Sequence, residues 1–217
     1  MSKENMIKLF NDFNKKYDIN TVFSDFLEIN AIAISNSVDK TDFDKKEERY
    51  KQIVKNYTKD EVKIFARIFA ELVLELENNP SDVLGDLFCE FKLNDSNKGQ
   101  VFTPLHIAKM MAAFTLKDAK KNIEEKGYVS LLEPSCGSGV NVIGCALYLK
   151  DIGINYQNHL FVKAIDIDLR CTLMTYIQLS LLGVPALVYH GDMLKQEKYS
   201  CWRTPFYCLH GLFKKTS

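Results

Sequence analysis

The sequence predicts an α/β fold in which a short parallel sheet follows a helical N-terminal region. Up to about residue 79, apolar residues recur at spacings of three and four, which is typical of amphipathic helices. Three short apolar runs, at 127–134, 160–168 and 186–192, then alternate with helical segments. Strands and helices that alternate at this spacing favour a parallel sheet with helices packed on it.

Composition limits the class of protein. The 217 residues are 47% hydrophobic and carry a formal net charge of zero, which suits one large domain, or a small domain with a helical appendage. The six cysteines include no Cys-x-x-Cys pair, so neither a disulfide framework nor a zinc site is predicted. No window reaches the roughly 18 consecutive apolar residues of a membrane span. We therefore expect a cytoplasmic protein that binds no metal.

The N-terminal part is predicted to be helical throughout. Its longest helix covers 60–78, where Asp60 can cap the start and Asn79-Pro80 ends the pattern. A shorter helix follows in "SDVLGDLFCEF", with Ser81 as its cap. The polar segment 92–104 reads as a loop, and the sequence changes character after it. We place the boundary there, which gives an N-terminal helical region at 1–98 and a second domain at 99–217.

A glycine turn follows the first predicted strand. Gly137 and Gly139 lie in "EPSCGSGV", just before an apolar run long enough for a helix. In an open parallel sheet, ligands bind beyond the carboxyl ends of the strands, where such a turn permits close approach. A dinucleotide site would have a third glycine at Val142, and a P-loop would have Gly-Lys-Ser/Thr, so pyrophosphate is not favoured. A plain helix cap without a ligand remains the alternative.

Acidic residues end each predicted strand: Glu133, Asp166 with Asp168, and Asp192. One such acid alone is equally well explained as a helix N-cap. As a set beside the glycine turn, they predict a crevice that binds a nucleoside. Carboxylates there can accept from ribose hydroxyls and an exocyclic amine, or lie near a cationic group. S-adenosylmethionine has all three features and lacks phosphate.

Four segments together resemble the adenine-N6 DNA methyltransferase family, especially the modification subunits of type I restriction systems. They are "KGQVFTPLHIAKMMA", "LLEPSCGSGVNVI", "AIDID" and "GDML", and the resemblance covers about 81–195. It implies a class I Rossmann-like methyltransferase fold with a short or incomplete sheet. It also implies S-adenosylmethionine as cofactor and double-stranded DNA as partner.

The resemblance also implies roles for single residues. The methionine part of the cofactor would contact Phe102 and Thr103, although these could instead be a core aromatic and a helix cap. Asp166 would hold the ribose, with Asp168 as the alternative in register. Asp192 would accept from the adenine amine while Met193 packs on the ring. The turn around the cofactor would consist of Glu133, Cys136, Gly137 and Gly139.

The catalytic loop of the family is missing from this sequence. An Asn/Asp-Pro-Pro-aromatic loop normally holds the adenine amine, and the nearest match is "RTPFY". Thr204, Pro205 and Tyr207 would then be catalytic, although a threonine hydroxyl accepts the amine less well than an amide oxygen. No clear apolar strand precedes this segment. The alternative is an ordinary turn before a last strand at 206–213.

The resemblance, together with the missing catalytic loop, leads to two possible functions. The first is methyl transfer from S-adenosylmethionine to adenine N6 in DNA. The second is a catalytically inactive cofactor-binding module that regulates a partner or opposes restriction. Cys136 lies inside the glycine turn, so the thiol attack of cytosine-5 methyltransferases is not predicted. A short sheet leaves an exposed edge, so we also expect a protein partner or self-association.

Overall fold

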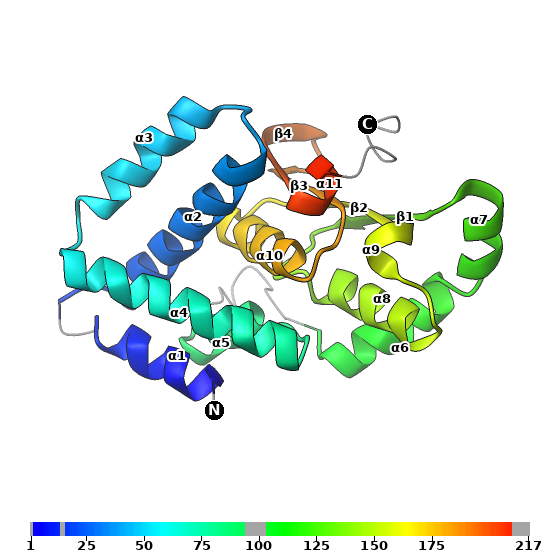
Figure 1. The fold of residues 1–217 in the computed structure, drawn as a ribbon, viewed down its shortest axis with the longest axis horizontal. Coiled ribbons are helices and arrows are strands. Elements are labelled where there is room, and N and C mark those ends of the chain that lie inside the picture. Colours follow the sequence, from blue (N-terminus) through cyan, green and yellow to red (C-terminus); the bar gives the residue numbers. More distant parts are fainter. Residues whose placement is uncertain (1, 14–15, 94–102, 210–217) are drawn as a thin grey trace.

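The computed structural model describes residues 2–13, 16–93 and 103–209. Its N-terminal part is helical, as predicted, and Figure 1 shows these helices packed side by side. They are α1 (Ser2–Asn11), α2 (Ile19–Val38), α3 (Phe43–Val54), α4 (Lys59–Asn78) and α5 (Val83–Glu90).

Two of the predicted helix caps are wrong. Helix α4 begins at a capping box, in which the Thr58 hydroxyl accepts from the Glu61 amide while the Glu61 side chain accepts from the Thr58 amide. Helix α5 is capped by Asp82, which accepts from the Gly85 amide, and not by Ser81. In both cases the residue that satisfies the free amides lies within two positions of the predicted one.

The second part of the chain forms a four-stranded, mostly parallel sheet with the order β1-β2-β3-β4. The three predicted strands pair in parallel, and β4 is antiparallel to β3. The strands are β1 (Val129–Pro134), β2 (Leu160–Asp166), β3 (Ala186–Asp192) and β4 (Glu197–Arg203). The helices are α6 (Leu105–Thr115), α7 (Ala119–Lys126), α8 (Val140–Asp151), α9 (Tyr156–His159), α10 (Leu169–Leu181) and α11 (Pro205–Leu209).

Strand β4 is the element that the sequence did not predict. Its first four residues are exposed, so it shows no apolar run. The predicted last strand at 206–213 is also wrong as far as the structure describes it, because residues up to Leu209 form helix α11.

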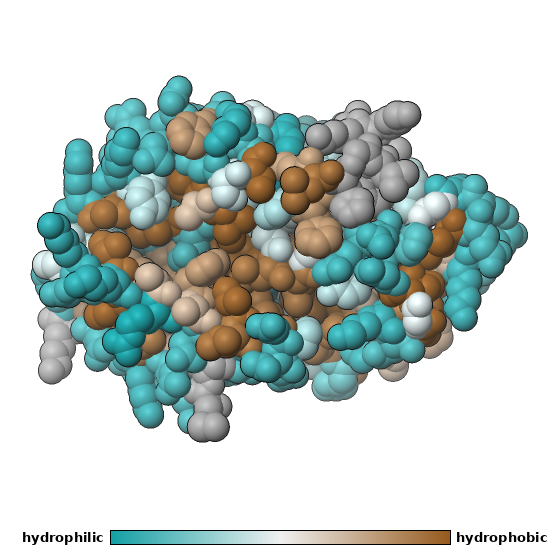
Figure 2. All heavy atoms as spheres, viewed as in Figure 1, coloured by the Kyte–Doolittle hydropathy of each residue, from teal (hydrophilic) through white to brown (hydrophobic). Residues whose placement is uncertain are grey.

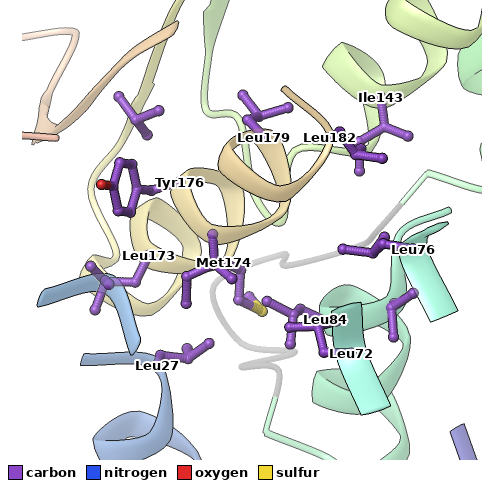
Figure 3. Packing of buried hydrophobic residues seen from close by; sticks show 14 of the residues in the cluster. Leu27, Leu72, Leu76, Leu84, Ile143, Leu173, Met174, Tyr176, Leu179 and Leu182 are labelled. Atoms are coloured by element: carbon purple, nitrogen blue, oxygen red, sulfur yellow. The ribbon is translucent and has the colours of Figure 1, made fainter. Parts of the chain in front are cut away.

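One hydrophobic core joins the helical region to the sheet. Helix α10 is almost wholly buried between the two, and Figure 3 shows Met174 of α10 close to Leu72 and Leu84 of the N-terminal helices. Apolar residues also gather in the middle of the face shown in Figure 2, within a hydrophilic periphery. The predicted boundary near residue 98 lies outside the residues that the structure describes.

The face of the sheet opposite α10 is covered by fewer helices. Near the amino ends of the parallel strands, α11 packs on this face, and the Tyr207 ring stacks on Phe161 with 5.8 Å between the ring centroids. Toward the carboxyl end, a hollow of about 350 Å³ opens between side chains of all four strands and the turn before β4. None of the described helices is long and apolar enough to span a membrane.

Candidate functional site

The glycine turn reverses the chain between β1 and α8 through three left-handed residues. Ser135, Gly137 and Gly139 have φ angles of 61°, 57° and 98°. A Cβ on Gly139 would lie 3.0 Å from the Thr175 hydroxyl oxygen and 3.3 Å from the Thr175 Cα of α10. The turn therefore needs glycine at this position for two reasons, its backbone angle and its close approach to α10.

Three amides of the turn already donate inside the protein. The Gly137 amide donates to Asp166 Oδ2 at 2.8 Å, the Cys136 amide to the Ile165 carbonyl at 2.9 Å, and the Gly139 amide to the Cys136 carbonyl at 2.9 Å. A phosphate cradle instead presents successive free amides to its ligand. The turn is thus anchored to the end of β2, and its geometry agrees with the sequence argument against pyrophosphate.

Asp166 lies where the turn meets the end of β2. Its Oδ1 accepts from the Asp168 amide at 2.9 Å, and burial raises the pKa of its carboxyl group. Within the described residues this carboxylate forms no ion pair. The carboxylate accepts from backbone amides at both oxygens, and its roughly four lone-pair sites leave capacity for a further donor.

Asp168 has a different environment. It caps helix α10 by accepting from the Arg170 amide, and its carboxylate pairs with the Arg170 guanidinium at 2.8 Å. That guanidinium also reaches Asn20 of α2 and lies over the Phe88 ring of α5. Asp168 therefore holds Arg170, which connects the sheet domain to the helical region.

Glu133 ends β1 beside the turn and is half-buried. The Asn141 amide nitrogen donates to Glu133 Oε1 at 2.9 Å, while burial raises the pKa of the carboxyl group. Asn141 Oδ1 is buried and has no hydrogen-bond partner among the described residues. Asn141 was not among the predicted site residues, although it lies in the first turn of the helix that follows the glycines.

Cys136 is a packing residue under the turn. It is 4% exposed, the Thr175 hydroxyl contacts its sulfur at 3.4 Å, and burial raises the pKa of its thiol to about 12. A neutral, buried thiol is a poor nucleophile, which agrees with the sequence argument against covalent catalysis by Cys136.

Asp192 and Met193 lie at the neighbouring strand end and line the 350 Å³ hollow. Asp192 Oδ1 accepts from the amides of Leu194 and Lys195 at 2.9 and 3.1 Å, so it caps the turn between β3 and β4. Gly191 is needed because a Cβ there would collide with the Glu197 carbonyl. Met193 is 40% exposed and is accessible to a ligand in the hollow.

Thr103 precedes helix α6, whose N-cap is Pro104. Helix α6 is docked tightly on α8, since a Cβ on Gly144 would lie 2.8 Å from the Ala108 carbonyl carbon. The segment that starts with Thr103 is therefore fixed to the helix that starts at the glycine turn. Phe102, predicted beside it, lies outside the described residues.

The structure places Thr204, Pro205 and Tyr207, the residues predicted to be catalytic, away from the glycine turn. Strand β4 runs from Glu197 beside Asp192 back to Arg203 beside Leu187, so Thr204 reaches the amino edge of the sheet. That edge lies about 20 Å from the glycine turn, one strand length away. Thr204 is fully buried and Tyr207 is 5% exposed, whereas Pro205 merely begins α11.

The hydroxyl of Thr204 has a structural role. It accepts from the Ala186 amide and donates to the Val184 carbonyl, both at 2.8 Å. It thereby satisfies two backbone groups at the start of β3, and an adenine amine has no access to it.

Taken together, fold and site define a mixed α/β protein whose glycine turn is tied to an acidic strand end. Over 129 residues the chain is 28% identical to the Type I restriction enzyme MjaVII methylase subunit of Methanocaldococcus jannaschii. The match covers 56% of this chain and 20% of that subunit, so the chain corresponds to about a fifth of its relative's length. The protein is thus a distant homologue of a type I restriction enzyme methylase subunit, which confirms the resemblance.

Two further comparisons give no match, since neither a family model nor a solved structure matches the chain. Among the residues with a described structure, no group of three or more His, Cys, Asp or Glu side chains could hold a metal ion.

Proposed function

We propose that this chain binds S-adenosylmethionine at the carboxyl edge of β1–β3 and serves methyl transfer to adenine N6 in DNA. The contact between the Gly137 amide and the Asp166 carboxylate carries the proposal. It sets a buried acceptor, with lone-pair capacity left for ribose hydroxyls, against a turn that a ligand can approach closely. Distant homology to a methylase subunit supports the same cofactor.

The residues present suit this cofactor. Glu133 and Asp166 offer two carboxylates that form no ion pair in the described part of the chain. Partly buried negative charge favours the sulfonium and ammonium groups of S-adenosylmethionine, and it disfavours a phosphate. The turn amides, already used within the protein, give the same preference.

Each residue has a proposed part in binding. Asp166 holds the ribose, because Asp168 is already paired with Arg170. Glu133 faces the cationic end, Thr103 lies toward the methionine part, and Asp192 with Met193 receives the adenine. When bound, S-adenosylmethionine would supply an electrophilic methyl group for adenine N6, with S-adenosylhomocysteine as the leaving group and the N6 proton lost to solvent.

A second candidate is a cofactor-binding module without catalysis that acts on a partner protein. The burial of Thr204 at the amino edge favours it, because the nearest match to the catalytic loop cannot reach the site. Under the first proposal, the groups that hold the target adenine of the DNA come from another polypeptide segment. DNA and a protein partner are proposals in both cases.

Methyl transfer separates the two candidates. The purified chain is incubated with S-adenosylmethionine and unmethylated DNA, and N6-methyladenine is counted by mass spectrometry, with Gly137→Asp as the blank. Product above the blank supports the methyltransferase. Cofactor that binds without product supports the module, and absence of both binding and product contradicts both candidates.

Replacing Asp166 with asparagine should weaken S-adenosylmethionine binding by about tenfold or more. The substitution removes the charge that strengthens the hydrogen bonds to ribose, worth about 1.5–3 kcal/mol. Asp168→Asn is the matched control, since it loses the pairing with Arg170 and weakens a helix cap. Calorimetric titration of both variants shows whether Asp166 or Asp168 binds the ribose. A larger loss of cofactor affinity in Asp168→Asn would reverse the assignment.

A further inference from the structure

A buried polar network joins the N-terminal helices to the glycine turn. At its centre is Asp82, the residue that caps α5, which is 7% exposed. One carboxylate oxygen accepts from the Gly85 amide at 3.1 Å and from Gln178 Nε2 at 2.9 Å. The other accepts from the hydroxyl of Ser138, which is part of the glycine turn.

Gln178 of α10 completes the network. Its Oε1 accepts from the Leu84 amide at 3.0 Å, and its Nε2 also donates to the Ser138 carbonyl at 2.9 Å. Ser138 is therefore held through both its side chain and its backbone, and it is fully buried. It lies between Gly137 and Gly139, the two left-handed glycines of the turn.

Helix α5 lies so close to the glycine turn that no side chain fits at Gly85. A Cβ on Gly85 would collide with the Asp82 carboxylate and crowd the Ser138 hydroxyl. The Asp82 carboxylate accepts three hydrogen bonds and forms no ion pair in the described chain. Replacing this carboxylate with an amide exchanges one acceptor oxygen for a donor nitrogen, so at least one of the three hydrogen bonds is lost, and buried donors that lose their acceptor are costly.

We propose that Asp82 is a positioning residue that fixes the shape of the glycine turn through Ser138, so that the N-terminal helices set the geometry of the candidate cofactor site. The consequence for cofactor affinity rests on the proposed function. The consequence for the turn itself does not, because the network exists without a ligand. Asp82 acts through Ser138 and is not itself assigned a contact with the cofactor.

The test compares Asp82→Asn with Asp86→Asn. Both aspartates lie at the start of α5, but the Asp86 side chain is 61% exposed and pairs with Lys3 on the surface. Hydrogen exchange of the amides at 136–143 is measured without cofactor, and S-adenosylmethionine affinity is then measured by calorimetry. Helix α4, which lies outside the network, reports global stability.

Asp82→Asn should speed exchange at the turn by about tenfold and weaken S-adenosylmethionine binding by a similar factor, with α4 unchanged. Asp86→Asn should leave both readouts at their wild-type values. Ser138→Ala removes one bond of the network and should shift both readouts in the same direction by a smaller factor. If Asp82→Asn does not fold, Ser138→Ala is used for the test in its place.

The outcomes distinguish this inference from the proposed function. Unchanged exchange at the turn in Asp82→Asn and Ser138→Ala overturns the positioning role, even if affinity falls. A wild-type protein that binds no S-adenosylmethionine, but whose turn still loosens in both variants, contradicts the proposed function and leaves the positioning role in place.

Discussion

Gly137→Asp should reduce S-adenosylmethionine affinity by at least about a hundredfold, a loss of roughly 3 kcal/mol in binding free energy. Gly137 has φ 57°, a region that aspartate tolerates better than most residues, so the protein should still fold. Under the proposed function, the new carboxylate would occupy the place where the cofactor approaches the turn. It would also stand beside Asp166, which accepts from the Gly137 amide at 2.8 Å.

Two control variants isolate the cause. Gly127→Asp places the same side chain at another left-handed glycine, φ 84°, where a Cβ meets nothing within 4 Å. It should bind the cofactor like the wild type. Gly137→Asn has nearly the same shape without the charge, so its difference from Gly137→Asp measures the electrostatic part. Calorimetry that finds wild-type affinity in Gly137→Asp would remove the glycine turn from the cofactor site.

Thr204→Val should lower the free energy of unfolding by about 2 kcal/mol or more, because the Ala186 amide and the Val184 carbonyl both lose a buried partner. Valine keeps the volume of threonine, so the loss reports the hydroxyl and not a cavity. S-adenosylmethionine affinity should not change, since Thr204 lies at the other edge of the sheet.

Thr204→Ser keeps the hydroxyl and should retain most of the stability. Urea denaturation of both variants gives the comparison, with the slope of the transition checked for a change in the unfolded state. A Thr204→Val protein of wild-type stability that had lost methyl transfer would restore the catalytic interpretation of "RTPFY".

The sequence was informative where local burial controls the pattern. Strands β2 and β3 are short apolar runs because a strand on each side and covering helices bury them, whereas β1 lies at one edge of the described sheet and is only partly buried. The N-terminal helices show the spacing of amphipathic faces. Strand β4 has no such signal, because it is a largely exposed edge strand. Because β4 is antiparallel to β3, Thr204 lies at the amino edge of the sheet and not at the carboxyl edge beside the glycine turn. Sequence spacing does not reveal strand direction.

The acids at the strand ends show a second limit. Helix capping and ligand binding use the same carboxylates, and both explanations were open for each acid. Asp168 and Asp192 do form capping bonds, whereas Asp166 bonds to the turn. The network around Asp82 was beyond prediction, because its members lie 56 and 96 residues apart and meet only in the folded core.

The central claim is that S-adenosylmethionine binds at the glycine turn. Titration of the cofactor into ¹⁵N-labelled protein, followed by amide chemical shifts, tests it most directly. We predict saturable shifts at Gly137, Ser138, Gly139 and Asp166, with smaller ones at Asp192 and Met193. Binding at the glycine turn is contradicted if no amide shifts, or if the shifts occur at the amino edge around Ala186 and Thr204.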